Sequence, residues 1–112
     1  MKYLFIFNEG LNEKSYNGLR LANSLSKIEN AVVKVYFFGD GVLCAKQDSE
    51  TNLKSTQSLI ENILKQNGEI STCGSCLDAR IISVSQLISG VKRGTLDEVA
   101  NWTCWSDKTL IF

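Results

Sequence analysis

The chain has 112 residues, 44% of them hydrophobic, and carries twelve lysine and arginine residues against twelve aspartate and glutamate residues. This length and apolar content predict one domain over residues 1–112, with a single core that needs no cross-links. The balanced charge gives no net field to gather nucleic acid or an anionic membrane surface, so neither is an expected partner.

Histidine is absent from the chain, which excludes Cys–His and Ser–His–Asp catalysis within one chain and removes the commonest metal ligand. The longest apolar runs, such as residues 3–7, fall far below the roughly 20 residues that a membrane helix needs, and the first residues lack the layout of a signal peptide. We therefore expect a cytoplasmic protein. In a reducing compartment its four cysteines are expected to be free thiols rather than two disulfides.

Strand-like and helix-like segments alternate from the start of the chain. Residues 3–7 form a continuous aromatic and branched run, which predicts a strand buried on both faces. Residues 14–29 carry apolar side chains at a three-residue spacing, which predicts a helix. Residues 31–38, rich in valine and aromatics, predict a second buried strand that ends in the turn Gly39-Asp40-Gly41.

The alternation continues to the end of the chain. An amphipathic helix with apolar positions from Leu53 to Leu64 is predicted to end at Asn67-Gly68. Residues 69–73 predict a short strand, and residues 77–89 predict a third helix that Gly90 ends.

The last segments complete the pattern. Thr95 and Glu98 fit a capping box and predict a short helix that starts there. Residues 108–112 predict the last strand.

Strands that alternate with helices predict an α/β fold with a parallel sheet and helices on both faces. Functional sites of such sheets lie beyond the carboxyl ends of the strands. The segments predicted on that rim are Asn8-Glu9-Gly10, Gly39-Asp40-Gly41 and Cys73-Gly74-Ser75-Cys76.

Cys73 and Cys76 are the most informative pair in the chain, because they stand three positions apart between a predicted strand and a predicted helix. A helix start there would aim the backbone N–H groups of Gly74, Ser75 and Cys76 at a thiolate, together with the positive end of the helix dipole. A thiolate is the form of cysteine that attacks sulfur. The pair therefore predicts sulfur chemistry.

Other interpretations of this pair remain open. Free cysteine is often simply a small buried apolar residue. One pair is half of a four-ligand zinc site, which Cys44 and Cys104 would complete only if the fold brought them there, so no metal is predicted. A dithiol redox motif also uses this spacing, although no histidine, proline or aromatic residue stands between the two cysteines.

Neighbouring residues are weaker candidates. Gly39 and Gly41 could let a loop pass close to the thiols while Asp40 orients a donor, although any strand exit can use glycine. Arg80 could favour a thiolate or persulfide by Coulomb attraction, although Asp78 and Arg80 could equally be solvated charges on a helix surface.

Three other residues are expected to be structural. Trp102 and Trp105 should mainly pack, or alternatively cover a subunit interface. Cys44 has no partner in sequence and is expected to be structural.

The sequence resembles the DsrE/DsrF-like family of small sulfur-relay proteins over essentially the whole chain. The resemblance is carried by YFFGDGV at residues 36–42, CGSCLDAR at residues 73–80, GTLDEVANW at residues 94–102 and SDKTLIF at residues 106–112. Cys76 matches the second cysteine of the CGxC-bearing branch. The family usually has glycine after the arginine, where this chain has Ile81.

This resemblance implies a three-layer α/β/α sandwich with a mainly parallel sheet, of flavodoxin-related topology. It also implies a cytoplasmic homo-oligomer, a trimer or hexamer, that needs no cofactor. In the sulfur-transferring branch, the cysteine that corresponds to Cys73 accepts sulfur as a persulfide and hands it to a partner's thiol. The resemblance therefore predicts a sulfur carrier with a protein sulfur donor and a protein acceptor.

Three functional hypotheses follow. The first is a sulfur carrier that uses Cys73, with Cys76 releasing the sulfur or guarding against overoxidation and Arg80 assisting the anion. The second is a non-enzymatic oligomeric scaffold or thiol-state sensor, which the missing base and the two tryptophans favour. The third is a dithiol oxidoreductase that uses Cys73 and Cys76 as a reversible disulfide.

Overall fold

The sheet of this protein is parallel throughout. The computed structural model describes residues 1–47 and 54–112. Within them, five strands pair in the order β4-β3-β2-β1-β5, and each strand runs parallel to its neighbours. The strands are β1 (Lys2–Phe7), β2 (Val32–Phe37), β3 (Glu69–Cys73), β4 (Lys92–Gly94) and β5 (Lys108–Ile111). The predicted α/β fold with a parallel sheet is therefore confirmed.

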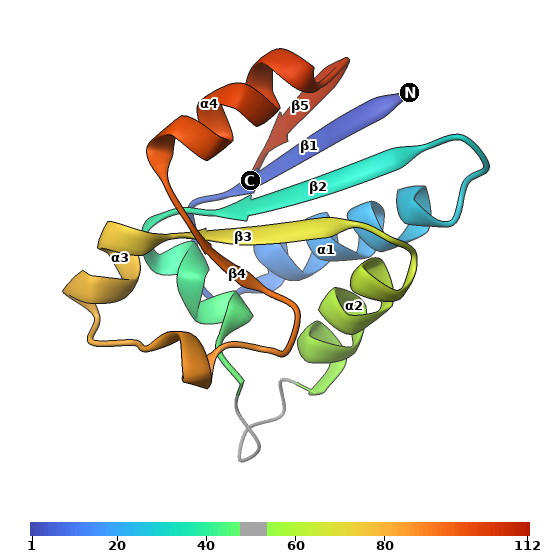
Figure 1. The fold of residues 1–112 in the computed structure, drawn as a ribbon. Helices are drawn as coiled ribbons and strands as arrows, with labels where there is room; N and C mark the ends of the chain where they lie inside the picture. Colours follow the sequence, from blue (N-terminus) through green and yellow to red (C-terminus); the bar gives the residue numbers. More distant parts are fainter. Residues whose placement is uncertain (48–53) are drawn as a thin grey trace.

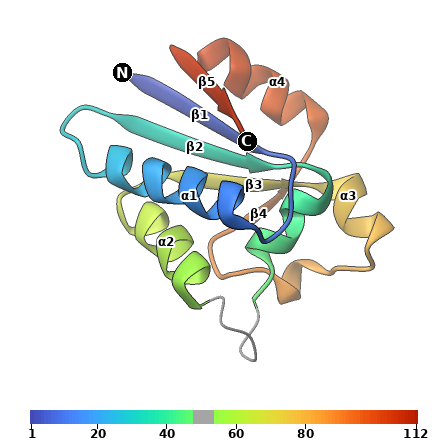
Figure 2. The same cartoon turned by 180° about the vertical axis from the view of Figure 1, so that it is seen from behind.

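Helices cover both faces of the sheet, which gives three layers. α1 (Glu13–Ser26) and α2 (Lys54–Lys65) lie side by side on one face, and α4 (Leu96–Trp105) lies on the other (Figures 1 and 2). The short helix α3 (Gly74–Ala79) and the 3-10 segment η1 (Gly39–Ala45) lie near the carboxyl ends of β3 and β2 (Figure 1). In the part of the chain that the structure describes, no helix is both long enough and apolar enough to cross a bilayer.

The core is built from aromatic side chains that the strands project toward the helices. Phe5 and Phe7 are fully buried and stack with Phe112. α1 approaches this stack closely, because a Cβ atom added at Gly18 would lie 2.6 Å from the Phe7 ring. On the opposite face Trp102 is only 7% exposed and meets the buried Tyr36 ring edge-on at 6.2 Å. The expectation that Trp102 packs is confirmed.

Local signals set the ends of α1 and α4. Asn12 caps α1, because its Oδ1 accepts the Ser15 backbone N–H at 2.8 Å. Thr95 caps α4 as predicted, and its Oγ1 accepts the Glu98 backbone N–H at 3.1 Å. The Glu98 carboxylate does not close the predicted capping box. It accepts the Ser71 hydroxyl instead and pairs with Lys92 at 3.5 Å.

The prediction of a helix over residues 77–89 is wrong. α3 ends at Ala79, and Ile81 takes a left-handed backbone conformation with φ of 54°. The Ile82 N–H then bonds back to the Leu77 carbonyl at 3.0 Å, which closes the helix end as a Schellman turn does. Of the four apolar residues that suggested a helix, Leu77 and Ile88 are buried, whereas Ile81 and Val84 are exposed. The segment after α3 is irregular and contains the short 3-10 turn η2 (Val84–Gln86).

Three further differences concern other segments. α1 ends at Ser26, earlier than the predicted residue 29. β4 was not predicted, because its sequence Lys-Arg-Gly has two exposed charges and no apolar alternation. The segment after β2, expected as a simple turn, is the 3-10 turn η1. Leu53, placed in the second helix by its apolar pattern, lies outside the described residues.

Candidate functional site

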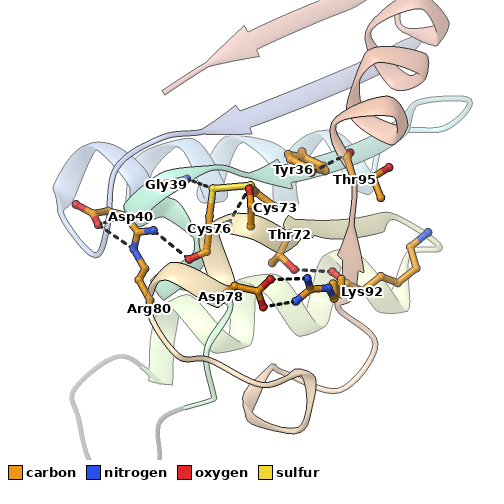
Figure 3. Close-up of a disulfide and its surroundings, with 12 residues drawn as sticks. Tyr36, Gly39, Asp40, Thr72, Cys73, Cys76, Asp78, Arg80, Lys92 and Thr95 are labelled. Atoms are coloured by element: carbon orange, nitrogen blue, oxygen red, sulfur yellow. Dashed lines mark hydrogen bonds and ion pairs between the residues drawn. A yellow bond between two sulfur atoms is a disulfide. The ribbon is translucent and has the colours of Figure 1, made fainter.

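The two cysteines of the CxxC segment lie at the carboxyl end of β3 and are joined to each other. Cys73 is the last residue of β3 and the N-cap of α3. Its sulfur forms a disulfide with Cys76, with 5.2 Å between the two Cα atoms (Figure 3). The expectation of free thiols is therefore wrong for this pair, whereas Cys44 and Cys104 are free.

Each sulfur of the disulfide receives its own hydrogen-bond donor. The Cys76 backbone N–H lies 3.3 Å from the Cys73 sulfur, and the Ser75 hydroxyl lies 3.3 Å from the same atom. The Gly39 backbone N–H, which comes from the end of β2, donates to the Cys76 sulfur at 3.2 Å. Of the three helix-start N–H groups predicted to face Cys73, the described contacts include one, that of Cys76.

Cys73 opens onto a cavity on the α4 side of β3 and β4. The Cys73 residue is only 9% exposed, so it belongs to the core, yet it lines a cavity of about 340 Å³. The residues that line this cavity are Phe38, Cys73, Gly74, Ser75, Arg93, Gly94, Thr95 and Leu96. Cys76 does not line it. Cys73 therefore borders a surface cavity although most of the residue is buried.

Arg80 contacts Asp40 and the backbone rather than a sulfur atom. Its Nε and Nη2 donate to Asp40 Oδ1 at 3.1 and 2.7 Å, and its Nη1 donates to the Cys76 carbonyl at 3.0 Å. The guanidinium thus ties η1 to α3 and holds the Gly39 N–H against Cys76 (Figure 3). The described contacts of Arg80 thus reach Asp40 and the Cys76 carbonyl rather than a sulfur atom. That Arg80 favours a thiolate or persulfide, and that Asp40 orients a donor, stay predictions.

Asp78 pairs with Arg93, a residue that sequence reasoning missed. The Arg93 Nη1 and Nη2 donate to the two carboxylate oxygens of Asp78 at 2.8 and 2.9 Å. These hydrogen bonds hold the pKa of Asp78 below its usual value. Arg93 lies on β4, so the only signal in the sequence was a basic residue just before the helix cap at Thr95.

The glycines of the segment after β2 have separate roles. Gly39 has a φ of 52°, a left-handed conformation that glycine adopts without strain and that turns its N–H toward Cys76. Gly41 is packed against β1, because an added Cβ atom would clash with the Phe7 carbonyl group, whose carbon would lie 2.9 Å away. Gly39 therefore belongs to the site, whereas Gly41 fixes the path of the chain beneath it.

The remaining cysteines lie apart from the disulfide. Cys44 is buried, its thiol lies 3.7 Å from the Glu9 carbonyl, and burial raises the pKa of this thiol to about 11. Cys104 is exposed on α4. Within residues 1–47 and 54–112, no three histidine, cysteine, aspartate or glutamate side chains gather in a way that could hold a metal ion.

Comparisons with known proteins agree with this architecture. The model of the DsrE/DsrF-like family matches residues 1–112. The chain is 35% identical to protein YchN of Escherichia coli over 102 residues, which cover 89% of this chain and 87% of YchN. It is 31% identical to an uncharacterized protein of Methanopyrus kandleri over 101 residues, which cover 89% of this chain and 83% of that protein.

Solved structures show the same fold. The crystal structure of YchN from Escherichia coli superposes with a TM-score of 0.87 at 33% identity, and the match covers 100% of this chain and 99% of that one. A protein of unknown function from Methanobacterium thermoautotrophicum superposes with a TM-score of 0.76 at 16% identity, covering 99% of this chain and 98% of that one. The second match is a likeness of fold alone.

Proposed function

The chain belongs to the DsrE/DsrF-like family, and from this premise we propose that it is a sulfur carrier that holds sulfur as a persulfide on Cys73. In the reduced protein, the Cys73 thiolate attacks the outer sulfur of a donor's persulfide. The donor's sulfur–sulfur bond breaks, and its electron pair leaves on the donor's inner sulfur as a thiolate. The exchange needs no external oxidant or reductant.

The observation that carries this proposal is the position of the Cys73 sulfur. It stands at the start of α3 and beside an open cavity, with the Cys76 N–H and the Ser75 hydroxyl each 3.3 Å away. Hydrogen-bond donors of this kind favour the charged form of a thiol over the neutral form. The cavity supplies the space in which a donor's sulfur can approach.

Cys76 fits the role of the releasing thiol. Its thiolate can attack the inner sulfur of the Cys73 persulfide, which forms the Cys73–Cys76 disulfide and expels the outer sulfur as hydrosulfide. The disulfide in the structure is what such a release step leaves behind. A thiol in the same cytoplasmic compartment would then restore the two free cysteines.

Mass spectrometry of the loaded protein tests the proposal. The reduced protein is incubated with a protein persulfide donor, and its intact mass is measured. We expect Cys76→Ala to gain one sulfur atom and keep it, because no releasing thiol remains, whereas Cys73→Ala should gain none. The double variant Cys76→Ala/Cys104→Ala is the matched control, since it also removes an exposed thiol outside the site and should load like Cys76→Ala. No gain in either the unchanged protein or Cys76→Ala rejects the proposal.

A second candidate function is a dithiol oxidoreductase, and the disulfide itself is the observation that favours it. In this function the disulfide would accept electrons from a substrate dithiol without carrying sulfur. Equilibration with glutathione and thioredoxin redox buffers tests it. A reduction potential far outside the range of both buffers removes this candidate.

The scaffold hypothesis is a third candidate, and it rests on apolar side chains that face solvent. Leu96 is 70% exposed on α4, and Ile111 is 64% exposed on the edge strand β5. We propose that copies of this chain assemble through exposed apolar side chains such as Ile111, into the trimer or hexamer that the family resemblance implies. Light scattering gives the mass of the assembly. A scaffold that does not use the thiol should retain its partners in Cys73→Ala.

A further inference from the structure

The cavity beside Cys73 has the size of a small-molecule site. Its volume of about 340 Å³ falls near the lower end of the roughly 300–1,000 Å³ that ligand pockets span. Phe38 and Leu96 supply apolar surface, and the Cys73 sulfur supplies the reactive atom. A small organic compound that bears one sulfur fits within such a space. A folded protein would have to insert a loop tip.

Arg93 gives this cavity its charge. Among the described residues that line the cavity, it is the only charged one. A guanidinium has five N–H donors, and Asp78 takes two of them, one from Nη1 and one from Nη2. The pair of hydrogen bonds fixes the plane of the guanidinium, and donors remain for a second acceptor. The start of α4, at Leu96, also lines the cavity and contributes the positive end of a ten-residue helix.

Gly74 allows Arg93 to lie close to the reactive sulfur. A Cβ atom added at Gly74 would lie 3.0 Å from the Cζ, Nε and Nη2 atoms of Arg93. The guanidinium therefore covers the backbone of the residue that directly follows Cys73. A ligand whose anionic group meets Arg93 has its sulfur within a short reach of the Cys73 sulfur.

We propose that this cavity binds a low-molecular-weight thiol, or the persulfide of such a thiol, that carries a negatively charged group, and that Arg93 anchors that group. The inference rests on the proposed function for its use of Cys73 and names the class of sulfur compound that reaches it. Arg93 is then a residue that determines specificity, because it selects among thiols by their charge.

The reaction with the oxidised protein is a thiol–disulfide exchange. The thiolate of the small compound attacks the Cys73 sulfur, and a new sulfur–sulfur bond forms between them. The Cys73–Cys76 bond breaks, and its electron pair stays on the Cys76 sulfur, which already accepts the Gly39 N–H. The products are a mixed disulfide on Cys73 and a thiolate on Cys76. With a persulfide and the reduced protein, the same anchor holds the donor while Cys73 takes its outer sulfur.

The rate at which small thiols open the disulfide tests the inference. The oxidised protein is treated with mercaptopropionate, which is anionic, and with mercaptoethanol, which is neutral, and each rate is divided by the rate of the same thiol with a small reference disulfide. We expect a corrected preference of about two- to fivefold for the anionic thiol, the range that a partly exposed ion pair supplies. Arg93→Gln should abolish this preference.

Arg80→Gln is the matched control. It removes a guanidinium on the other side of the disulfide, which contacts Asp40 rather than the cavity, and it should keep the charge preference whatever it does to the overall rate. In the unchanged protein, added salt should reduce the preference toward one, because it screens the attraction. Equal rates for the two thiols in the unchanged protein, or equal loss of the preference in Arg80→Gln and Arg93→Gln, overturn the inference.

The failure of this inference and the failure of the proposed function give different results. If Cys76→Ala takes sulfur from a protein donor but the disulfide shows no charge preference, only the small-molecule site is rejected. If the charge preference depends on Arg93 but no persulfide forms with any donor, the small-molecule site is supported and the sulfur-carrier function is rejected.

Discussion

The backbone N–H of Gly39 donates a hydrogen bond to the sulfur of Cys76 across a distance of 3.2 Å. The two residues follow neighbouring parallel strands, β2 and β3, whose carboxyl ends meet at one edge of the sheet. The Asp40–Arg80 ion pair joins the same two segments, the start of η1 and the end of α3 (Figure 3). Cys76 is the sulfur that leaves when a thiol attacks Cys73. It is thus hydrogen-bonded by a residue outside its own helix α3.

Loosening this contact should slow the opening of the disulfide. Asp40→Asn and Arg80→Gln each release η1 from α3, so the departing Cys76 thiolate loses part of its stabilisation from Gly39. We expect opening by mercaptoethanol to slow about two- to fivefold in each variant, the range set by a partly exposed ion pair. The double variant should be no slower than Arg80→Gln alone, because Asp40 acts through Arg80. Arg20→Gln on α1, whose guanidinium contacts Asn17, is the control and should leave the rate unchanged. Additive effects would contradict the prediction.

Gly41→Ala should destabilise the fold, and Gly10→Ala should not. A Cβ atom at position 41 clashes with the backbone of Phe7, which cannot move without disturbing β1. At position 10 an added Cβ atom lies 3.5 Å from the Asp40 carbonyl oxygen, an ordinary contact. Urea denaturation should give a loss of about 1–3 kcal/mol for Gly41→Ala. A loss of the same size for Gly10→Ala would show that the close approach to Phe7 is not the cause.

Ile81→Gly should stabilise the protein. Ile81 has a φ of 54° and is 89% exposed, so its side chain strains the backbone and gains little from burial. Glycine adopts this conformation freely, and we expect a gain of about 0.5–1 kcal/mol after its greater freedom in the unfolded chain is subtracted. Val84→Gly, at an exposed position without a positive φ, should instead lower stability in the same urea experiment. A loss of stability in Ile81→Gly would show that the side chain makes a contact that outweighs the strain.

Cys44 should resist alkylation while Cys104 reacts. Burial raises the pKa of the Cys44 thiol to about 11, so at about pH 8 only about one thiol in a thousand is a thiolate. Cys104 is exposed and open to the reagent. Iodoacetamide followed by peptide mass spectrometry, on the oxidised protein, should place the label on Cys104 first. Rapid labelling of Cys44 under native conditions would show that its site opens.

The same thiol makes stability depend on pH in the alkaline range. The pKa of Cys44 rises from 9.0 to about 11 on folding, so the folded state holds this proton more tightly than the unfolded state. The contribution of Cys44 is therefore fully present below about pH 9 and is lost as the pH rises toward 11. In Cys44→Ala, urea midpoints measured across this range should fall less steeply. An unchanged slope would mean that other groups carry the alkaline loss.

The α/β architecture could be predicted from the sequence because the buried strands differ in residue pattern from the helices between them. The run that became β1 is aromatic and branched, and the run that became β2 is rich in valine and aromatics. β3 agrees with its predicted bounds of residues 69–73 although Ser71 and Thr72 are polar. β4 was not predicted because its two charged side chains are exposed and its three residues have no apolar alternation. Edge strands of this kind carry no apolar signal.

Only part of the candidate site could be predicted from the sequence. The strand-to-helix pattern predicted its position at the end of β3, but it did not predict which charged residues pair there. Asp78 pairs with Arg93, fifteen positions later, and Arg80 pairs with Asp40, forty positions earlier. Such pairs depend on which strand ends meet in the sheet. The helix predicted over residues 77–89 is wrong because two of its four spaced apolar residues, Ile81 and Val84, face solvent and the chain turns at Ile81.

The position of Cys73 at the junction of β3 and α3 makes the two sulfurs unequal before any reagent arrives. Cys73 lines an open cavity, whereas the Cys76 sulfur accepts the backbone N–H of Gly39 at the end of the adjoining strand. If the proposed reaction holds, sulfur would enter at Cys73 and Cys76 would be the thiol that releases it. A chain whose bridge had two equivalent ends would have to distinguish incoming from outgoing sulfur by some other means.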